Sequence, residues 1–246
     1  MAKERLNKLM CERGCAASLD EANRKILAKE VKVNDSYLTT PSELVPVDAQ
    51  IEVKETCPYV SRGGIKLKGA IDAFDVKVYG KNCIDIGSST GGFSDCLLQE
   101  GAGRVACVDV NYGQLAWEVR QNERSAVFER TNIKKADPQE LGAPFDLIVI
   151  DVSFIGLASL APVLKRFAHE PAEGKTELVA LVKPEFEASH EENVGGLVAD
   201  DDVRERTVAE VKAALSEQGF TVQDVIESPI RGKKKGNKEF LLYAKY

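Results

Sequence analysis

Hydrophobic residues recur at helical spacing twice within the first 57 residues of the chain. The two apolar faces consist of Leu6, Leu9 and Met10, and then of Ala22, Ile26 and Leu27. Ser18 and Glu21 have the spacing of a capping box at the start of the second helix. Behind it, "VKVND" (31–35) is typical of a strand entering a turn, and positions 47–53 alternate as in a half-buried strand. The pattern predicts a small α+β domain over residues 1–57.

From residue 58 the pattern changes, and short apolar runs alternate with helical patterns. The runs cover 83–86, 105–110, 145–150 and 178–182, a further strand leads into "ERTNIKK" (129–135), and the helices are expected at 91–100, 111–121, 156–168 and 202–218. Nearly continuous apolar runs are typical of parallel strands that are covered on both faces. "FTVQDVI" and "EFLLYAKY" predict a final antiparallel pair. The fold class is therefore α/β, with a doubly wound sheet over residues 64–246 and residues 58–63 as the linker.

Composition narrows the functional classes. The chain has 43% hydrophobic residues and no apolar run long enough to span a membrane, so we expect a cytoplasmic globular protein without stable membrane insertion. Six cysteines without a C-x-x-C pair and only two histidines predict reduced structural thiols and no metal site. The net charge of −6 argues against a uniformly basic nucleic-acid binder but allows local basic patches.

The glycine-rich turn "IDIGSSTGG" (84–92) follows the first strand of the predicted sheet, where open α/β sheets bind ligands. Its glycine spacing fits neither a dinucleotide fingerprint nor a P-loop. It resembles motif I of the class I (Rossmann-like) methyltransferases, which implies S-adenosylmethionine as the cofactor. Asp85 could accept from the cofactor's ammonium and Asp109 from its ribose, and the adenine is expected near Asn132. The remaining residues assigned to the cofactor are Gly87, Ser88, Ser89, Thr90, Gly91, Gly92 and Phe93.

The N-terminal segment "RLNKLMCERGCAASLDEANRKILAKEVKVND" resembles the S4 RNA-binding module along its whole length. That resemblance implies binding of structured RNA. The polar helix faces of this segment offer basic side chains for such a role, namely Arg5, Lys8, Arg13, Arg24 and Lys25.

Three charged residues are expected at the edge of the sheet that carries the glycine turn. Asp151 and Lys183 end parallel strands, and Glu239 begins the antiparallel last strand. Around them, "YVSRGGIKL", "DIGSSTGGFSD", "VDVNYGQL", "DVSF", "LVKPEFE" and "GNKEF" occur in the order found in the TlyA (hemolysin A) family, which the chain resembles over nearly its whole length. The resemblance implies an S4 domain joined to an FtsJ-like methyltransferase that 2′-O-methylates ribose, with cytidine as the expected nucleoside, in ribosomal RNA or the ribosomal subunit. It also implies a catalytic tetrad of Lys66, Asp151, Lys183 and Glu239.

Such a tetrad suits a ribose hydroxyl, which is a poor nucleophile until a positioned base removes its proton. Lys183 is the candidate base, because Lys66 and the cofactor's sulfonium would disfavour a charged amine there. Asp151 and Glu239 would orient the lysines and the hydroxyl. Phe186 could stack on a splayed base, although a core position is an equal alternative.

Two basic segments without acids flank the predicted catalytic region, and they would form a phosphate track if they converge. Outside the tetrad, their basic residues assigned to RNA are Arg62, Lys68, Arg231, Lys233, Lys234 and Lys235. A solvated lysine loop is the alternative.

Two other functions compete with this interpretation. The chain could be a non-catalytic, ribosome-associated RNA-binding protein, which the intact motifs disfavour. A base methyltransferase would carry an Asn/Asp-Pro-Pro-aromatic loop where "DVSF" stands. The hemolysin label finds no support in a membrane-spanning or strongly amphipathic basic segment.

Overall fold

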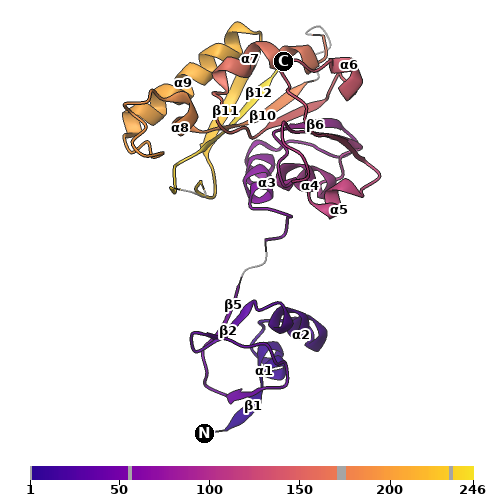
Figure 1. The fold of residues 1–246 in the computed structure, drawn as a ribbon, viewed down its shortest axis with the longest axis vertical. Helices are drawn as coiled ribbons and strands as arrows, with labels where there is room; N and C mark the ends of the chain where they lie inside the picture. The colour runs from indigo at the N-terminus through magenta and orange to yellow at the C-terminus, as the bar shows by residue number, and fades with distance from the viewer. Residues whose placement is uncertain (1, 55–56, 171–175, 233–234) are drawn as a thin grey trace. The chain divides into compact units, whose positions relative to one another are not determined.

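The chain folds into two compact units, Met1–Cys57 and Pro58–Tyr246 (Figure 1). The computed structural model describes residues 2–54, 57–170, 176–232 and 235–246. The boundary between the units falls between Cys57 and Pro58. Each unit has its own hydrophobic core.

The first unit is the expected small α+β fold. Its elements are β1 (Lys3–Arg5), α1 (Leu6–Glu12), α2 (Leu19–Leu27), β2 (Val31–Val33), β3 (Ser36–Tyr37), β4 (Leu44–Pro46) and β5 (Ile51–Val53). β1 pairs with β4, and β2 lies between β3 and β5, all antiparallel. The N-cap half of the capping box forms, because Ser18 Oγ accepts from the Glu21 amide at 3.2 Å. The Glu21 carboxylate accepts from the Ala17 amide at 2.7 Å, one residue before the N-cap.

Two details of this unit differ from the prediction. Leu27 is 64% exposed, because one residue of helix turns it about 100° away from the buried Ile26. The strand expected over 47–53 begins only at Ile51. Before it, the guanidinium of Arg13 donates to the carbonyls of Val47 and Ala49 and holds this stretch as a loop.

The second unit is built on one seven-stranded sheet in the order β11-β12-β10-β9-β6-β7-β8. Its strands are β6 (Asn82–Ile86), β7 (Arg104–Val108), β8 (Ser125–Phe128), β9 (Leu147–Ile150), β10 (Glu177–Val182), β11 (Thr221–Glu227) and β12 (Phe240–Lys245). Only β12 runs antiparallel, between β10 and β11. The doubly wound sheet and the final antiparallel pair are therefore confirmed.

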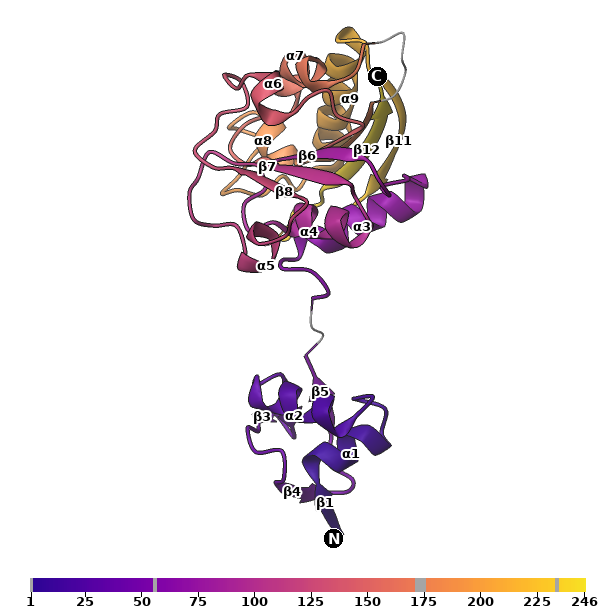
Figure 2. The ribbon, with the colours of Figure 1, turned by 90° about the vertical axis from the view of Figure 1, so that its right-hand side faces the viewer.

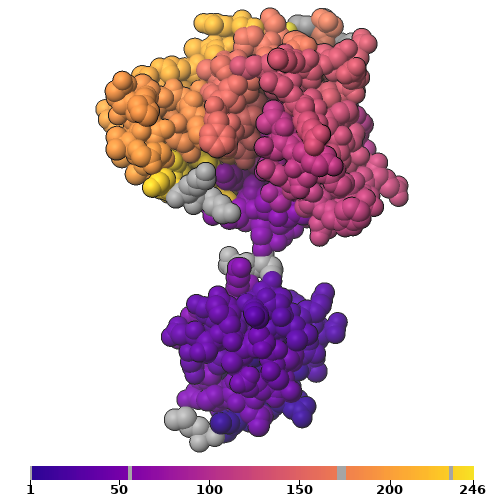
Figure 3. All heavy atoms as spheres, viewed as in Figure 1, coloured from indigo at the N-terminus to yellow at the C-terminus, as the bar shows by residue number. Residues whose placement is uncertain are grey.

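Helices cover both faces of this sheet (Figure 2). One face carries α3 (Gly63–Phe74), α4 (Gly92–Gln99) and α5 (Trp117–Arg120). The other face carries α6 (Pro138–Leu141), η1 (Ala158–Leu160), α7 (Ala161–Leu164), η2 (Lys165–Phe167) and α9 (Asp201–Glu217). The short helix α8 (Pro184–Glu187) follows β10. The purple-to-pink and the orange-to-yellow parts of this unit pack directly against each other (Figure 3). Among the described residues, no helix is both long enough and apolar enough to cross a membrane.

Three predicted segments of the second unit take another form. The helix expected over 111–121 is reduced to α5, and that over 156–168 is broken into η1, α7 and η2, with Pro162 in its interior. Residues 58–63 are not a free linker. The Val60 amide donates to Asp95 Oδ2 at 2.8 Å, and Gln99 Nε2 donates to the Pro58 carbonyl at 3.0 Å, so the segment packs onto α4.

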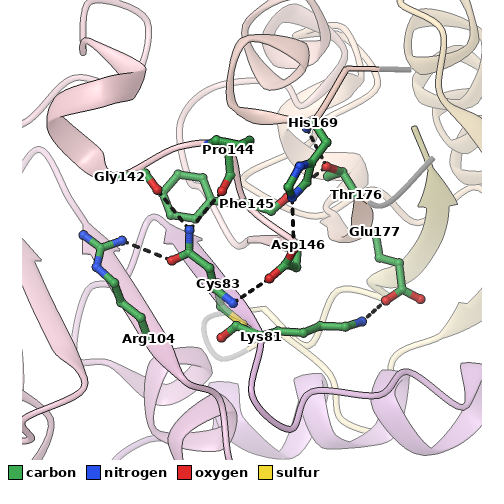
Figure 4. A network of polar contacts seen from close by, with 11 residues as sticks. Lys81, Cys83, Arg104, Gly142, Pro144, Phe145, Asp146, His169, Thr176 and Glu177 are labelled. Carbon is green, nitrogen blue, oxygen red and sulfur yellow. Dashed lines mark hydrogen bonds and ion pairs between the residues drawn. The ribbon is translucent and has the colours of Figure 1, made fainter. Parts of the chain in front are cut away.

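The edge formed by the amino ends of the parallel strands carries a dense polar network (Figure 4). Asp146 Oδ2 accepts from the Asn82 amide at 2.9 Å, and its Oδ1 lies 2.9 Å from His169 Nε2. Glu177 binds both Lys81 and the hydroxyl of Tyr243. These charged side chains are thus satisfied within the protein.

Candidate active site

The opposite edge, at the carboxyl ends of the parallel strands, is hollowed where the strand order reverses. The chain runs from β6 outward to β7 and β8 and then returns to β9 on the other side of β6. Ligands of open α/β sheets bind at such a switch point. A cavity of about 410 Å³ lies here, and we call it the first cavity. It is lined by the segments that follow β6, β7, β8 and β9, including Gly87, Asp109, Asn132 and Asp151.

Gly87 fixes the turn after β6. Its φ is +88°, and a Cβ at this position would lie 2.5 Å from the Asp151 carbonyl oxygen. Its amide donates to the Val108 carbonyl at 2.8 Å, which ties the turn to β7 as well. Only glycine combines this conformation with such a close approach. The turn therefore holds open the space between the ends of the neighbouring strands.

Asp109 directly follows β7 and lines the first cavity. Its Oδ2 accepts from the Ser89 amide at 2.8 Å, and its Oδ1 accepts from the Asn111 amide at 2.7 Å. These bonds hold the carboxylate in one orientation, and the residue remains partly exposed. A carboxylate that accepts hydrogen bonds from the two hydroxyls of a ribose would need this exposure.

Asp85 lies elsewhere than expected. It is fully buried, Ser94 Oγ donates to its Oδ2 at 2.6 Å, and it does not line the first cavity. The geometry therefore does not make it a direct ligand of the cofactor. Its Oδ1 has no hydrogen-bond partner among the described residues. Burial, reinforced by the charges of Asp151 and Asp109, raises the pKa of Asp85 to about 7.

This charge distribution fits a cationic cofactor. Three carboxyl groups, on Asp85, Asp109 and Asp151, lie close enough to act on one another electrostatically. Asp85 Oδ1 and Asp151 Oδ1 are buried without a hydrogen-bond partner among the described residues, although Asp151 Oδ1 is ion-paired with Lys183. A positive charge bound in the first cavity would offset their mutual repulsion. S-adenosylmethionine carries such charges on its sulfonium and ammonium groups.

The other residues assigned to the cofactor divide into two groups. Gly87, Ser89, Asp109 and Asn132 line the first cavity, whereas Ser88, Thr90, Gly91, Gly92 and Phe93 do not. Four of the latter five are buried beneath the turn, and the carbonyl of the exposed Thr90 accepts from the Ala116 amide. Asn132 Oδ1 is already bound to the Lys134 amide at 3.0 Å. No sequence signal marks the apolar wall of this cavity, which includes Val110 and Ile133, because such residues look like ordinary core in a sequence.

The four tetrad residues form two ion pairs. Lys66 Nζ lies 2.5 Å from Glu239 Oε2, and Lys183 Nζ lies 2.5 Å from Asp151 Oδ1. The side chains of Lys66, Glu239 and Lys183 are 10%, 4% and 11% exposed. Topology explains the meeting: Lys183 follows β10, Glu239 precedes β12, and the register pairs the adjacent Val182 with Phe240. Lys66 enters from α3, a placement that periodicity did not predict.

A second cavity of about 440 Å³ adjoins the first. Lys66, Lys183 and Glu239 line it, while Asp151 lines the first cavity. Ser153 and Phe154 line both, so the two cavities share a wall. The 2.5 Å pair between Asp151 and Lys183 therefore joins the two cavities.

The two basic segments of this unit converge, as expected. Arg62 donates to the Arg231 carbonyl at 2.7 Å, and Lys235 lines the second cavity with Lys66. Lys68 does not belong to this group, because it pairs with Asp72 and Glu100. Lys233 and Lys234 lie outside the described residues.

The basic residues of the first unit have different environments. Arg5, Lys8 and Arg24 are exposed. Lys25 pairs with Glu21 at 2.7 Å, and Arg13 is committed to the loop carbonyls described above. The first three are thus the more accessible to a partner.

Known proteins resemble the chain along its whole length. The family model described as FtsJ-like methyltransferase matches residues 59–246. "Putative rRNA methyltransferase YqxC" of Bacillus subtilis is 44% identical, over 98% of this chain and 85% of the relative. "16S/23S rRNA (cytidine-2'-O)-methyltransferase TlyA" of Mycobacterium tuberculosis is 38% identical, over 98% and 89%. A solved structure, "Putative hemolysin from Streptococcus thermophilus", covers 100% of this chain and 89% of its own at 36% identity and a TM-score of 0.75.

The matched region contains both cavities, the glycine turn and all four tetrad residues. On this match, the chain belongs to the FtsJ-like methyltransferase family and uses S-adenosylmethionine as its cofactor.

Proposed function

We propose that the protein transfers the methyl group of S-adenosylmethionine to the ribose 2′-hydroxyl of a cytidine in ribosomal RNA, free or in a ribosomal subunit. The observation that carries this proposal is the shared wall of the two cavities, with Asp151 in one and Lys183 in the other, 2.5 Å apart. The relatives named for rRNA methylation support the substrate class. Ribosomal RNA as substrate would place the activity in the cytoplasm.

In this proposal the first cavity holds the cofactor. Asp109 accepts from the ribose hydroxyls, the backbone at Gly87 and Ser89 contacts the amino-acid end, and the segment around Asn132 faces the adenine. Asp85 acts from beneath the turn through its charge and not by contact. The bound cofactor supplies an electrophilic methyl group with a neutral thioether as its leaving group.

Lys183 is the proposed general base. The substrate hydroxyl would enter the second cavity beside its amine, while Asp151 and Ser153 Oγ, at 3.1 Å, hold the side chain in one orientation. The 2′-hydroxyl proton passes to neutral Lys183 Nζ as the oxygen–carbon bond forms. Lys66 and Glu239, paired with each other, confine the substrate on the opposite side.

RNA would reach the second cavity along the basic residues beside it. Arg62, Arg231 and Lys235 gather there, and Lys233 and Lys234 continue the same run in the sequence. Phosphate contacts of this kind supply affinity without sequence specificity. The first unit, as an S4-like domain, would add affinity for folded RNA through Arg5, Lys8 and Arg24 without taking part in the chemistry.

Mapping of 2′-O-methyl groups after incubation of unmodified ribosomal subunits and naked rRNA with the protein and S-adenosylmethionine tests this function. We expect one or a few discrete cytidine 2′-O-methyl sites. Methylation only of bases, or no methylation of either RNA, would contradict the proposal.

Comparison of residues 58–246 with the full chain tests the role of the first unit. We expect the shorter chain to bind rRNA more weakly while keeping cofactor affinity. Equal RNA binding and methylation by both chains would exclude an RNA-binding role for residues 1–57.

A further inference from the structure

Two residues that line the second cavity each have a buried side-chain oxygen without a hydrogen-bond partner in the described part of the chain. Glu185 Oε2 and Asn193 Oδ1 have no hydrogen-bond partner among the described residues, and both residues line this cavity. Neither residue belongs to the tetrad. Burying a polar atom without a partner is unfavourable, so an unsatisfied pair of this kind calls for a ligand that completes it.

Both oxygens are held in place by their surroundings. Glu185 lies in α8, two residues after Lys183. Asn193 Nδ2 donates to the Glu185 carbonyl at 2.7 Å, which fixes the orientation of the amide and leaves its Oδ1 as the acceptor. The two side chains thus form a small unit beside the proposed base, and we call it the acceptor pair.

The acceptor pair requires hydrogen-bond donors. The side-chain oxygen of asparagine accepts hydrogen bonds and cannot donate them, and the same holds for an ionised carboxylate. Burial raises the pKa of Glu185, with a smaller contribution from Glu239, while its own backbone amide, Lys183 and Asn237 act in the opposite direction. An incoming N–H group would therefore both satisfy the buried oxygens and stabilise the ionised carboxylate.

The cavity has the size and shape for one nucleoside. Its volume of about 440 Å³ lies within the range of small-ligand sites. Phe186 and Phe154 line it, with ring centroids 5.6 Å apart, and provide flat apolar surface on which a base can lie. A ribose placed at Lys183 would therefore extend its base toward α8.

We propose that Glu185 and Asn193 recognise the exocyclic amino group of the target base and so select cytidine over uridine. This inference rests on the proposed function. The amino group of cytosine has two N–H donors for the two acceptors, and glutamate is a known acceptor from that group. Uracil presents a carbonyl oxygen at the same position, opposite two other acceptors. Uridine would thus be rejected by unpaired and repelling oxygens.

The test uses two rRNA transcripts that differ only at the mapped nucleotide, which is cytidine in one and uridine in the other. The ratio of kcat/KM for the two is measured with the full chain. For the unaltered protein we expect a preference for cytidine of about 10- to 100-fold, as a well-placed pair of base contacts gives. Glu185→Gln introduces a donor that can face the uracil carbonyl, so the preference should fall by about tenfold or more. Asn193→Ala, which removes one acceptor, should lower it as well.

Glu191→Gln is the matched control, because Glu191 is exposed and close in sequence. It should leave the ratio unchanged. A ratio measured within one protein does not depend on how much of that protein is folded, so a merely structural role of Glu185 would not move it. Unchanged ratios in both Glu185→Gln and Asn193→Ala would overturn the inference. A ratio near one in the unaltered protein would also overturn it and would leave the proposed methylation standing, whereas no methylation of either transcript would refute the proposed function itself.

Discussion

The two edges of the large sheet differ in how completely the polar side chains there are satisfied by hydrogen bonds within the protein. At the amino edge, Asp146 and Glu177 each bind two protein groups, and among the described residues there Ser125 Oγ, at the start of β8, is the buried side-chain atom without a hydrogen-bond partner. At the carboxyl edge, Asp85, Glu185 and Asn193 each leave a buried oxygen without a partner among the described residues. Both edges contain partly or largely buried ion pairs, such as Lys81–Glu177 at the amino edge and Lys66–Glu239 at the carboxyl edge.

This difference distinguishes polar groups that stabilise the fold from polar groups that are available to a ligand. A satisfied network stabilises the ends of the strands and leaves nothing for a ligand to bind. An unsatisfied set is maintained at a cost in stability, and such costs are typical of functional sites. The two cavities lie at the unsatisfied edge. Perturbing one edge should thus change catalysis, and perturbing the other should change stability.

The largest expected effect is on the rate of methyl transfer in Lys183→Met. Methionine keeps an apolar stem but removes the amine that pairs with Asp151. We expect a loss of about 10²–10⁴ in the single-turnover rate, with cofactor binding retained. Lys81→Met is the control, because it breaks the comparable pair with Glu177 at the amino edge and should leave the rate unchanged. An unaltered rate in Lys183→Met would rule out Lys183 as the base.

The next largest effect is on cofactor affinity in Gly87→Ala. The new Cβ would meet the Asp151 carbonyl at 2.5 Å and force the turn to move. Calorimetry should show binding at least about tenfold weaker, which corresponds to ~1.4 kcal/mol. The control is Gly80→Ala at the amino edge. Gly80 also has a positive φ, but a Cβ at this position would meet no atom within 4 Å. This substitution should cost about 1–2 kcal/mol of stability and no affinity. Equal affinities in the two variants would argue against the turn as the cofactor site.

Asp146→Ala should lower stability without affecting catalysis. It leaves the Asn82 amide and His169 without their shared acceptor. Denaturant unfolding should show a loss of about 1–3 kcal/mol. The methylation rate, measured well below the unfolding midpoint, should stay the same. A fall in that rate with cofactor and RNA affinities intact would show that the edges are coupled.

The smallest effect is the pH dependence of cofactor binding. Because the pKa of buried Asp85 is raised to about 7, the unfolded chain loses this proton at lower pH than the folded chain does. The stability of the unliganded protein therefore falls as pH rises from about 4 toward 7. A cationic cofactor favours the ionised carboxylate, so its dissociation constant should decrease by up to about tenfold between about pH 6 and pH 8.

Asp85→Asn is the control for this titration, since it cannot ionise. Its affinity should lack the Asp85 contribution to the pH dependence. If the variant and the original protein show the same pH profile, some other group is responsible.

The sequence predicted which residues lie at the carboxyl edge of the sheet better than it predicted where each side chain points. Asp109, Asp151 and Lys183 follow the last residue of a strand and project at the edge, as expected. Asp85 lies within β6, where alternate residues face opposite sides of the sheet. It therefore points under α4 toward Ser94 and not into the first cavity. Counting from the end of the strand would have revealed this.

Other features depend on contacts that no local pattern contains. Lys66 reaches the tetrad because α3 packs beside α4 and β12, and periodicity describes only the helix itself. Asn193 lies between α8 and α9 in a segment without regular alternation. Its role depends on a bond to the Glu185 carbonyl, so only the three-dimensional structure could indicate it.

The central claim, that the carboxyl edge methylates a ribose hydroxyl, is tested most directly by one atom of the substrate. An rRNA fragment is prepared with a single 2′-deoxycytidine at the mapped nucleotide, and methyl incorporation is compared with that of the all-ribose fragment. We predict that the deoxy fragment binds with similar affinity and accepts no methyl group at this nucleotide. Methylation that persists at the deoxynucleotide would place the methyl group on the base and contradict the account.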